Sequence, residues 1–422
     1  MLRRFSLYGF LKNQRYFEPF LLLAFLEKGL SFTEIGLLVA VREIFVNLME
    51  IPSGALADLY GRRRCMLFSF ASYIVSFVLL GWAEGFVTLA VAMLFFGVGE
   101  AFRTGTHKAM IFAWLRVQGR IEERTKVYGY TRSWSKIGSA ISVSAAAVMV
   151  LASASYSVIF YVTIIPYLLG MVNVLGYPAA LDGGTSLRPS ARVVVRHLVE
   201  TLRQLIGRVP LRRLMLESMG FEGFFKSAGN YLQPILLAAA VVATASILPL
   251  ESFNEAQRAS LLVGPVYLVL HSLSAVASRN SHRLVGDSAG EERASLRLWR
   301  ILAVVCVVVT PALYWEWYPL MILGFVALHF LHDLWRPVLI SRFDSQSSET
   351  QGATLLSAEN QAKSVGTMLL APLLGILVDL VRVYGPGGQF WPIGLVGIIL
   401  AFSFSFGRRD GKRGAGPSLF ST

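Results

Sequence analysis

The sequence predicts an all-α integral membrane protein with twelve transmembrane helices, arranged as two six-helix bundles related by a pseudo-two-fold axis. The first observation is composition: of 422 residues, 55% are hydrophobic and only 15% are charged, whereas soluble domains carry about 25% charged residues. The second is that the apolar residues form runs of about 20 residues, the length that crosses a bilayer. The third is that the basic residues gather on one side of these runs. This pattern argues against an ordinary soluble enzyme.

Apolar runs of helical length predict the twelve spans and their order. They cover approximately residues 16–31, 34–57, 65–83, 87–113, 128–152, 157–179, 213–243, 259–278, 298–315, 318–341, 355–380 and 391–407. The first is marginal because charged residues crowd its ends, and charges interrupt the seventh and the tenth. We expect no cleavable signal, since Arg3 and Arg4 precede an interrupted apolar stretch without a small-residue cleavage site.

The basic residues test this count of spans. With the N-terminus in the cytoplasm, 28 of the 39 lysines and arginines lie in cytoplasmic segments, 3 lie outside and 8 lie within spans. Such an asymmetry is what the positive-inside rule requires. The net charge of +13 therefore follows from membrane topology, and no nucleic-acid partner is needed. Both termini are predicted to be cytoplasmic.

A polar connection divides the chain into two halves. The predicted units are an N-terminal six-helix bundle (1–180), a basic cytoplasmic linker (181–212) and a C-terminal six-helix bundle with a short cytoplasmic tail (213–422). Several linker arginines share one helical face, which predicts a surface helix against lipid headgroups or, alternatively, a site for a regulatory partner. Six plus six spans, with a binding site between the halves, is a transporter plan.

A short motif lies between the second and third spans. It reads Gly54-Ala-Leu-Ala-Asp58-Leu-Tyr-Gly61-Arg62-Arg63-Arg64. We expect Gly54 to permit close helix approach and Gly61 to supply a tight reversal. The motif resembles the loop signature of the major facilitator superfamily, Gly-x-Leu-Ala-Asp-x-x-Gly-Arg-Arg/Lys, and it occupies the same place between helices two and three.

The resemblance implies a function for this motif. Asp58 would belong to an interdomain latch that closes the cytoplasmic side, within a gating motif that also includes Gly54, Gly61, Arg62 and Arg63. The alternative is that the arginines only anchor the positive side of the membrane. The resemblance also implies that helices three, six, nine and twelve are outer supports. Those four spans contain no ionisable side chain away from their ends, so the charged spans are the ones expected to line a cavity.

Charges at membrane depth mark a transport pathway unless they only pair with one another. We expect substrate or proton binding from Glu43, Glu100, Arg103, His107, Glu222, Lys226, His332, Asp333 and Arg336. Several of them lie three or four residues apart, which predicts local ion pairs. These pairs are Glu100–Arg103, Asp333–Arg336, Glu222–Lys226 and Glu359–Lys363. The alternative is that such pairs only hold helices together.

Three further cations are predicted to form a cytoplasmic gate: Arg132, Lys136 and Lys363. Arg132 and Lys136 are like charges one helical turn apart, so they need an acid from elsewhere or an anionic ligand. For these two, a gate or headgroup contact competes with substrate capture.

Other intramembrane side chains leave alternatives open. Glu50 is expected to be structural. His329, His332 and Asp333 could form a metal cluster, but the pattern is weak without further ligands, and a proton relay suits a histidine beside a carboxylate better. Trp134 and Trp335 lie next to the buried charges and either line the cavity or pack between helices.

The resulting hypothesis is a secondary active transporter that moves a small organic solute by alternating access, coupled to protons. The sequence contains no phosphate-binding Gly-x-x-x-x-Gly-Lys-Ser/Thr loop and no hydrolytic or zinc motif, so we expect neither an enzyme nor a cofactor. Alternatives are a non-transporting scaffold or receptor and a metal-ion transporter. The expected partners are a small-molecule substrate, protons and the lipid bilayer, for a monomer in a prokaryotic inner membrane.

Overall fold

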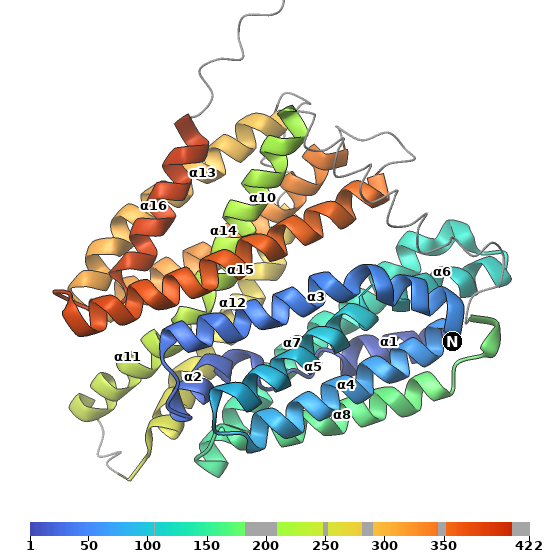
Figure 1. Ribbon diagram of the computed structural model, residues 1–422, viewed down its shortest axis with the longest axis horizontal. Helices are drawn as coiled ribbons and strands as arrows, with labels where there is room; N and C mark the ends of the chain where they lie inside the picture. Colours follow the sequence, from blue (N-terminus) through green and yellow to red (C-terminus); the bar gives the residue numbers. More distant parts are fainter. Residues whose placement is uncertain (105, 182–208, 248–251, 281–289, 345–351, 407–422) are drawn as a thin grey trace, which may run out of the picture.

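The computed structural model describes residues 1–104, 106–181, 209–247, 252–280, 290–344 and 352–406, and its regular elements within these ranges are all helices. A few side chains inside the helices, that of Asp58 among them, also lie outside the description. Of the predicted linker, residues 182–208 fall outside the described part. Figure 1 shows two groups of helices, one from each half of the chain.

The N-terminal group contains the elements up to residue 181. In order they are α1 (Leu2–Leu11), η1 (Glu18–Phe20), α2 (Leu21–Glu27), α3 (Phe32–Tyr60), α4 (Arg62–Trp82), α5 (Phe86–Arg103), α6 (Thr106–Val117), η2 (Ile121–Glu123), α7 (Arg124–Ser153), α8 (Ser157–Leu175) and η3 (Ala179–Leu181).

The C-terminal group contains the remaining described elements. They are α10 (Val209–Ala228), η4 (Gly229–Tyr231), α11 (Leu232–Ile247), α12 (Glu255–Asn280), α13 (Gly290–Tyr314), α14 (Tyr318–Asp344), α15 (Gly352–Tyr384) and α16 (Trp391–Phe406).

Each predicted span corresponds to one helix or to one interrupted helix. Within the described residues, 8 helical stretches are long and apolar enough to cross a membrane, and Trp391–Ser405 is a shorter apolar helix. The other predicted spans correspond to α1 with α2, to α3 and to α12. The order and number of spans expected from the apolar runs therefore match the helices of the structure.

The first span differs from its prediction. The helical segment begins at Leu2 rather than near residue 16, and it is interrupted between α1 and η1. Lys12 and Arg15, which precede the predicted first span, lie in this interruption and line the pockets of the bundle. A search for apolar runs excludes this stretch, because its charged residues lower the mean hydropathy.

Gly61 separates α3 from α4 with a φ of 96°. Residues with a Cβ rarely adopt this backbone conformation, so the predicted reversal at Gly61 is confirmed. The prediction for Gly54 is wrong: a Cβ placed there would meet no atom within 4 Å. Gly54 therefore is not a point of close helix approach in this conformation.

The two bundles are sealed together at their predicted outer end, where α3 meets α15. Asp379 of α15 accepts hydrogen bonds from the backbone N–H groups of Phe32 (3.2 Å) and Thr33 (2.7 Å) and from the Thr33 hydroxyl (2.6 Å). The first N–H groups of a helix have no acceptors within that helix. Here a carboxylate of the opposite bundle supplies the acceptors for the first N–H groups of α3. We call these contacts the outer seal.

Two glycines let the helices of the outer seal approach so closely. A Cβ at Gly36 would lie 2.4 Å from the carbonyl oxygen of Ala371, and one at Gly375 would lie 2.3 Å from that of Phe32. Small residues at such crossings allow backbone-to-backbone packing. Toward the other end of the molecule, α3 and α15 diverge (Figure 1).

Further hydrogen bonds join the bundles near the same end. Gln233 of α11 accepts from the Leu22 N–H at 2.8 Å and donates to the Glu18 carbonyl at 3.0 Å. Asn254 and Gln257 donate to backbone carbonyls at the end of α7. The outer end is therefore closed by polar contacts as well as by packing.

Trp335 packs within the C-terminal bundle. It is fully buried, stacks on Phe221 with ring centroids 4.3 Å apart and meets Trp299 edge-on at 5.3 Å. Trp134 is 38% exposed on α7. Neither tryptophan lines a described cavity. Of the two alternatives predicted for Trp335, packing between helices is therefore the one that the structure supports.

Candidate functional site

A central cavity of about 610 Å³ lies between the two bundles. Its walls come from the α1–α2 segment, α3, α5 and α7 on one side and from α10 with η4, α12, α14 and α15 on the other. In the described part of the chain, α4, α8, α13 and α16 contribute no lining residue. These four are the predicted spans without central charges, so the arrangement implied by the resemblance agrees with the structure.

Glu100 is the centre of a charge cluster in the N-terminal bundle. It accepts hydrogen bonds from Arg103, as its spacing predicted, and from the Tyr73 hydroxyl at 2.8 Å. The Arg15 guanidinium lies 3.6 Å from its second carboxylate oxygen. Arg15 is not among the predicted site residues, because it precedes the predicted first span.

Glu43 joins the two bundles inside the cavity. Its carboxylate accepts hydrogen bonds from Arg42 of α3 at 2.7 Å, from the Ser364 hydroxyl of α15, and from Lys226 of α10 at 3.5 Å. The predicted pair between Glu222 and Lys226 is therefore wrong. The lysine reaches across to the opposite bundle, an interaction that sequence spacing within one helix cannot reveal.

Glu222 and Arg336 form the corresponding cluster in the C-terminal bundle. Glu222 lies 3.2 Å from the His332 Nε2 and 3.6 Å from Arg336. Arg336 makes a bidentate pair with Glu359, at 2.6 and 3.1 Å. The predicted local pairs Asp333–Arg336 and Glu359–Lys363 are wrong, because Arg336 extends to α15 rather than along its own helix.

Asp333 lines the central cavity with a side chain that is 25% exposed. Its carboxylate lies 3.9 Å from the Nδ1 of His332, whose ring stacks on Phe225 at 3.8 Å. His329 instead contacts the Phe325 carbonyl through its Nδ1 at 2.8 Å. Within the described residues, no group of three or more histidine, cysteine or acidic side chains could hold a metal ion.

The remaining predicted site residues are distributed over several places. Lys136 and Lys363 line the central cavity, while Arg132 and His107 line a smaller neighbouring pocket. In the gating motif, Arg63 donates to the Tyr177 carbonyl at 3.1 Å, within its own bundle. The role of Asp58 and of the other motif residues stays a prediction, since the Asp58 side chain lies outside the description.

Comparison with known proteins identifies the family. The sequence profile of the Major Facilitator Superfamily matches residues 13–358, which is well over half of the chain. The chain belongs to this superfamily. This result confirms the predicted all-α membrane fold and the resemblance to this superfamily. It also confirms the prediction that the protein is a transporter and not an enzyme.

Two named relatives share short stretches of sequence with the chain. It is 29% identical over 90 residues to the uncharacterized MFS-type transporter YxaM of Bacillus subtilis (strain 168), covering 21% of this chain. It is 29% identical over 125 residues to a probable L-galactonate transporter of Escherichia coli (strain K12), covering 30% of this chain. The matches span 23% and 27% of the lengths of these relatives.

Solved structures resemble the chain over nearly its whole length. The nucleoside transporter NupG has a TM-score of 0.75 at 12% identity, covering 96% of this chain and 98% of that one. A D-xylose-proton symporter has a TM-score of 0.66 at 14% identity, covering 96% of each chain. At these identities the likeness establishes the superfamily fold.

Proposed function

We propose that this superfamily member is a secondary active transporter that moves a small polar organic solute through the central cavity, coupled to protons. The observation that carries the proposal is the placement of Glu100 and Asp333. They lie in different bundles yet line one cavity, and the Glu43–Lys226 ion pair crosses it. Charged groups at membrane depth persist where they face one another or a wet pathway.

Alternating access explains how the cavity would work. In the proposed cycle, this conformation, closed at its predicted outer end, is the one that exchanges solute with the cytoplasm. To take up or release solute outside, the bundles must separate at the outer seal and close at the other end.

The cavity suits a solute rich in hydroxyl groups. A volume of about 610 Å³ lies within the range of small-molecule sites, and the lining mixes acids, bases and amides such as Asn13, Asn230 and Asn360. The named relatives point to the same class: a nucleoside transporter, a D-xylose-proton symporter and a probable L-galactonate transporter. We therefore propose a sugar, a sugar acid or a nucleoside.

Asp333 and Glu100 are the proposed proton carriers. Asp333 is partly exposed to the cavity and does not pair with its predicted arginine, because Arg336 binds Glu359. Its carboxylate therefore faces the cavity rather than a guanidinium group. Glu100 is held by Arg103 and Arg15, and it would take a proton when solute draws those guanidinium groups away.

Transport in proteoliposomes tests this proposal. Purified protein is reconstituted with an imposed pH gradient, and uptake of labelled D-xylose, L-galactonate and uridine is measured. Asp333→Asn and Glu100→Gln are expected to abolish pH-driven accumulation while solute exchange without a gradient persists. Glu122→Gln, on the exposed η2 turn, is the matched control.

Two outcomes would contradict it. Unchanged pH-driven uptake in both variants would remove these acids from the coupling mechanism. Binding without any flux, for every solute that stabilises the protein, would favour the non-transporting scaffold instead.

A further inference from the structure

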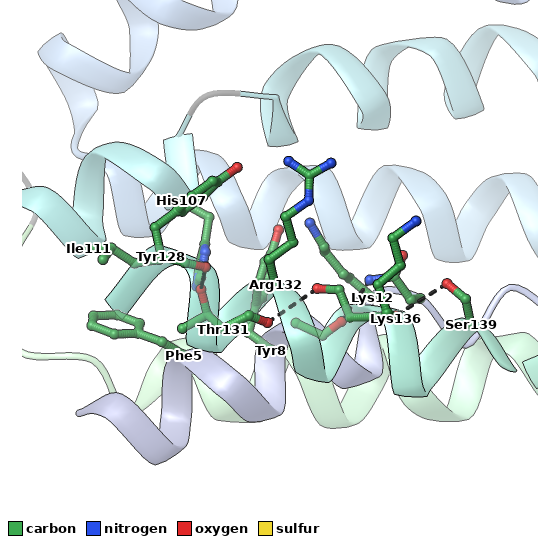
Figure 2. Close-up of a pocket in the computed structure, with 13 residues that line it drawn as sticks. Phe5, Tyr8, Lys12, His107, Ile111, Tyr128, Thr131, Arg132, Lys136 and Ser139 are labelled. Carbon is green, nitrogen blue, oxygen red and sulfur yellow. Dashed lines mark hydrogen bonds between the residues drawn. The ribbon is translucent and has the colours of Figure 1, made fainter. Parts of the chain in front are cut away.

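A second pocket of about 380 Å³ lies within the N-terminal bundle, between α1, α6 and α7. It adjoins the central cavity, because Asn13, Lys136 and Ser139 line both. Figure 2 shows Lys12, which directly follows α1, beside Arg132 and Lys136 of α7. We call this space the cationic side pocket.

The charged residues that are described in the lining of this pocket are all basic. Lys12, Arg132 and Lys136 line it, and no aspartate or glutamate is among its described lining residues. The nearby acid of the same bundle, Glu100, is engaged by Arg103 and Arg15. The Arg132 and Lys136 side chains are exposed at this pocket, so their charged groups are accessible to a dissolved anion, and a negative group between like charges lowers their mutual repulsion. The central cavity differs, since its lining includes several acids as well as bases.

The other walls leave the cations as the main donors. The Ser139 hydroxyl donates to the Ser135 carbonyl at 3.2 Å, and the Asn13 amide donates to the Gly9 carbonyl at 2.7 Å. Tyr8 and His107 stack with ring centroids 3.7 Å apart, and the Lys12 ammonium lies 5.6 Å from the centroid of the Tyr8 ring. A ligand here would meet the three cationic groups together with these aromatic rings.

We infer that the cationic side pocket binds a phosphate group. Up to three positive charges match an oxyanion with two negative charges better than a single carboxylate, and both guanidinium and ammonium groups bind phosphate oxygens strongly. This inference rests on the proposed function and narrows its solute class to a phosphorylated sugar or nucleoside, whose phosphate would enter the pocket from the adjoining central cavity. A lipid headgroup is the second source of the same chemistry.

Equilibrium binding of inorganic phosphate tests the inference without requiring transport. The full chain is purified in neutral detergent, and potassium phosphate is titrated at constant ionic strength against potassium chloride, with calorimetry and thermal unfolding as readouts. We expect saturable binding and a rise in Tm with phosphate but not with chloride. The double variant Arg132→Gln/Lys136→Gln should weaken binding by about 100-fold, since the removal of each charge-assisted hydrogen bond lowers affinity by about tenfold.

Matched variants separate binding from folding. Arg124→Gln/Lys126→Gln removes the same charge from exposed positions of the same helix that do not line the pocket, and it should bind phosphate as the unaltered protein does. Arg132→Lys/Lys136→Arg keeps the charge and should retain most of the affinity. Equal phosphate binding by the two glutamine variants would overturn the inference, as would equal stabilisation by phosphate and chloride.

The source of the phosphate is resolved in vesicles. If lipid headgroups occupy the pocket, galactolipid vesicles that contain phosphatidylglycerol should weaken phosphate binding compared with galactolipid vesicles given the same surface charge by a fatty acid; a dissolved anion predicts equal affinities. Both results support the phosphate site. Failure of transport with intact phosphate binding would contradict only the proposed function, and loss of phosphate specificity with intact transport would contradict only this inference.

Discussion

Glu43 is the side chain at which the two bundles meet inside the cavity. It is buried, and its carboxylate contacts a guanidinium from its own helix and an ammonium and a hydroxyl from the opposite bundle. A carboxylate in this position can hold the halves together in one conformation and release them in another. In the proposed cycle, the contacts of Glu43 with the opposite bundle would break when the two bundles separate.

Glu43→Gln should destabilise this conformation by about 2 kcal/mol, because it leaves Arg42 and Lys226 without their shared acid. The double variant Glu43→Gln/Lys226→Gln should be less destabilised than the sum of the single variants, with a coupling of about 1 kcal/mol. Denaturant unfolding in detergent measures all three. Strict additivity would contradict a direct Glu43–Lys226 interaction, and Glu122→Gln serves as the control for charge removal.

At the scale of helices, breaks and crossings determine where charged side chains point. The interruption after α1 brings Arg15 to Glu100, and the broken helix at η4 places Gly229 and Asn230 in the cavity wall. Helices interrupted near the membrane midplane are recurrent in transporters because irregular backbone is tolerated beside a cavity. The two interruptions lie in the first span of each half.

At the crossing of α3 and α15, we predict how substitutions of Asp379 change the outer seal. Asp379→Ala removes three hydrogen bonds to a carboxylate, each contributing about 1.5–3 kcal/mol. We expect the ratio of open to sealed outer ends to rise at least about tenfold. Asp379→Asn, which keeps one acceptor oxygen, should give an intermediate shift.

Distance measurement by electron–electron resonance checks this shift. Spin labels at Trp82→Cys and Tyr384→Cys, both exposed near the predicted outer end, report the separation of the bundles in a background with Cys65 and Cys306 replaced by alanine. The exposed Glu84→Ala variant is the control. An unaltered distance distribution in Asp379→Ala would show that the outer seal does not set the conformational balance.

At the scale of the whole molecule, the two bundles and the membrane define which end faces which compartment. The positive-inside distribution assigns the α6–α7 connection to the cytoplasm and the α4–α5 connection to the outside. Gln118 and Glu84 are exposed residues in these two connections. They report on opposite faces of the bilayer.

Labelling with a membrane-impermeant maleimide tests this orientation. Glu84→Cys is expected to react in intact cells, whereas Gln118→Cys should react only after permeabilisation. The native Cys65 and Cys306 are buried, so the unaltered protein should give little background. The reverse pattern of reaction would invert the topology and reassign the outer seal to the cytoplasmic side.

Composition and the pattern of apolar and charged residues were enough to predict the class of protein, the order of the helices and which helices face the cavity. These properties depend on apolar length, on the side that carries lysine and arginine, and on the cost of charge at membrane depth, all of which are local to each span. The local pair Glu100–Arg103 was likewise predictable, because one helical turn fixes its geometry.

The partners of the other charged residues became known only from the folded arrangement of the helices. Lys226 contacts Glu43, and Arg336 contacts Glu359, because long side chains extend to whichever neighbouring helix offers an acid. The cap on α3 by Asp379 and the grouping of Lys12 with Arg132 and Lys136 arise in the same way. Contacts between helices far apart in sequence depend on how those helices cross and rotate, which no repeat along a single helix specifies.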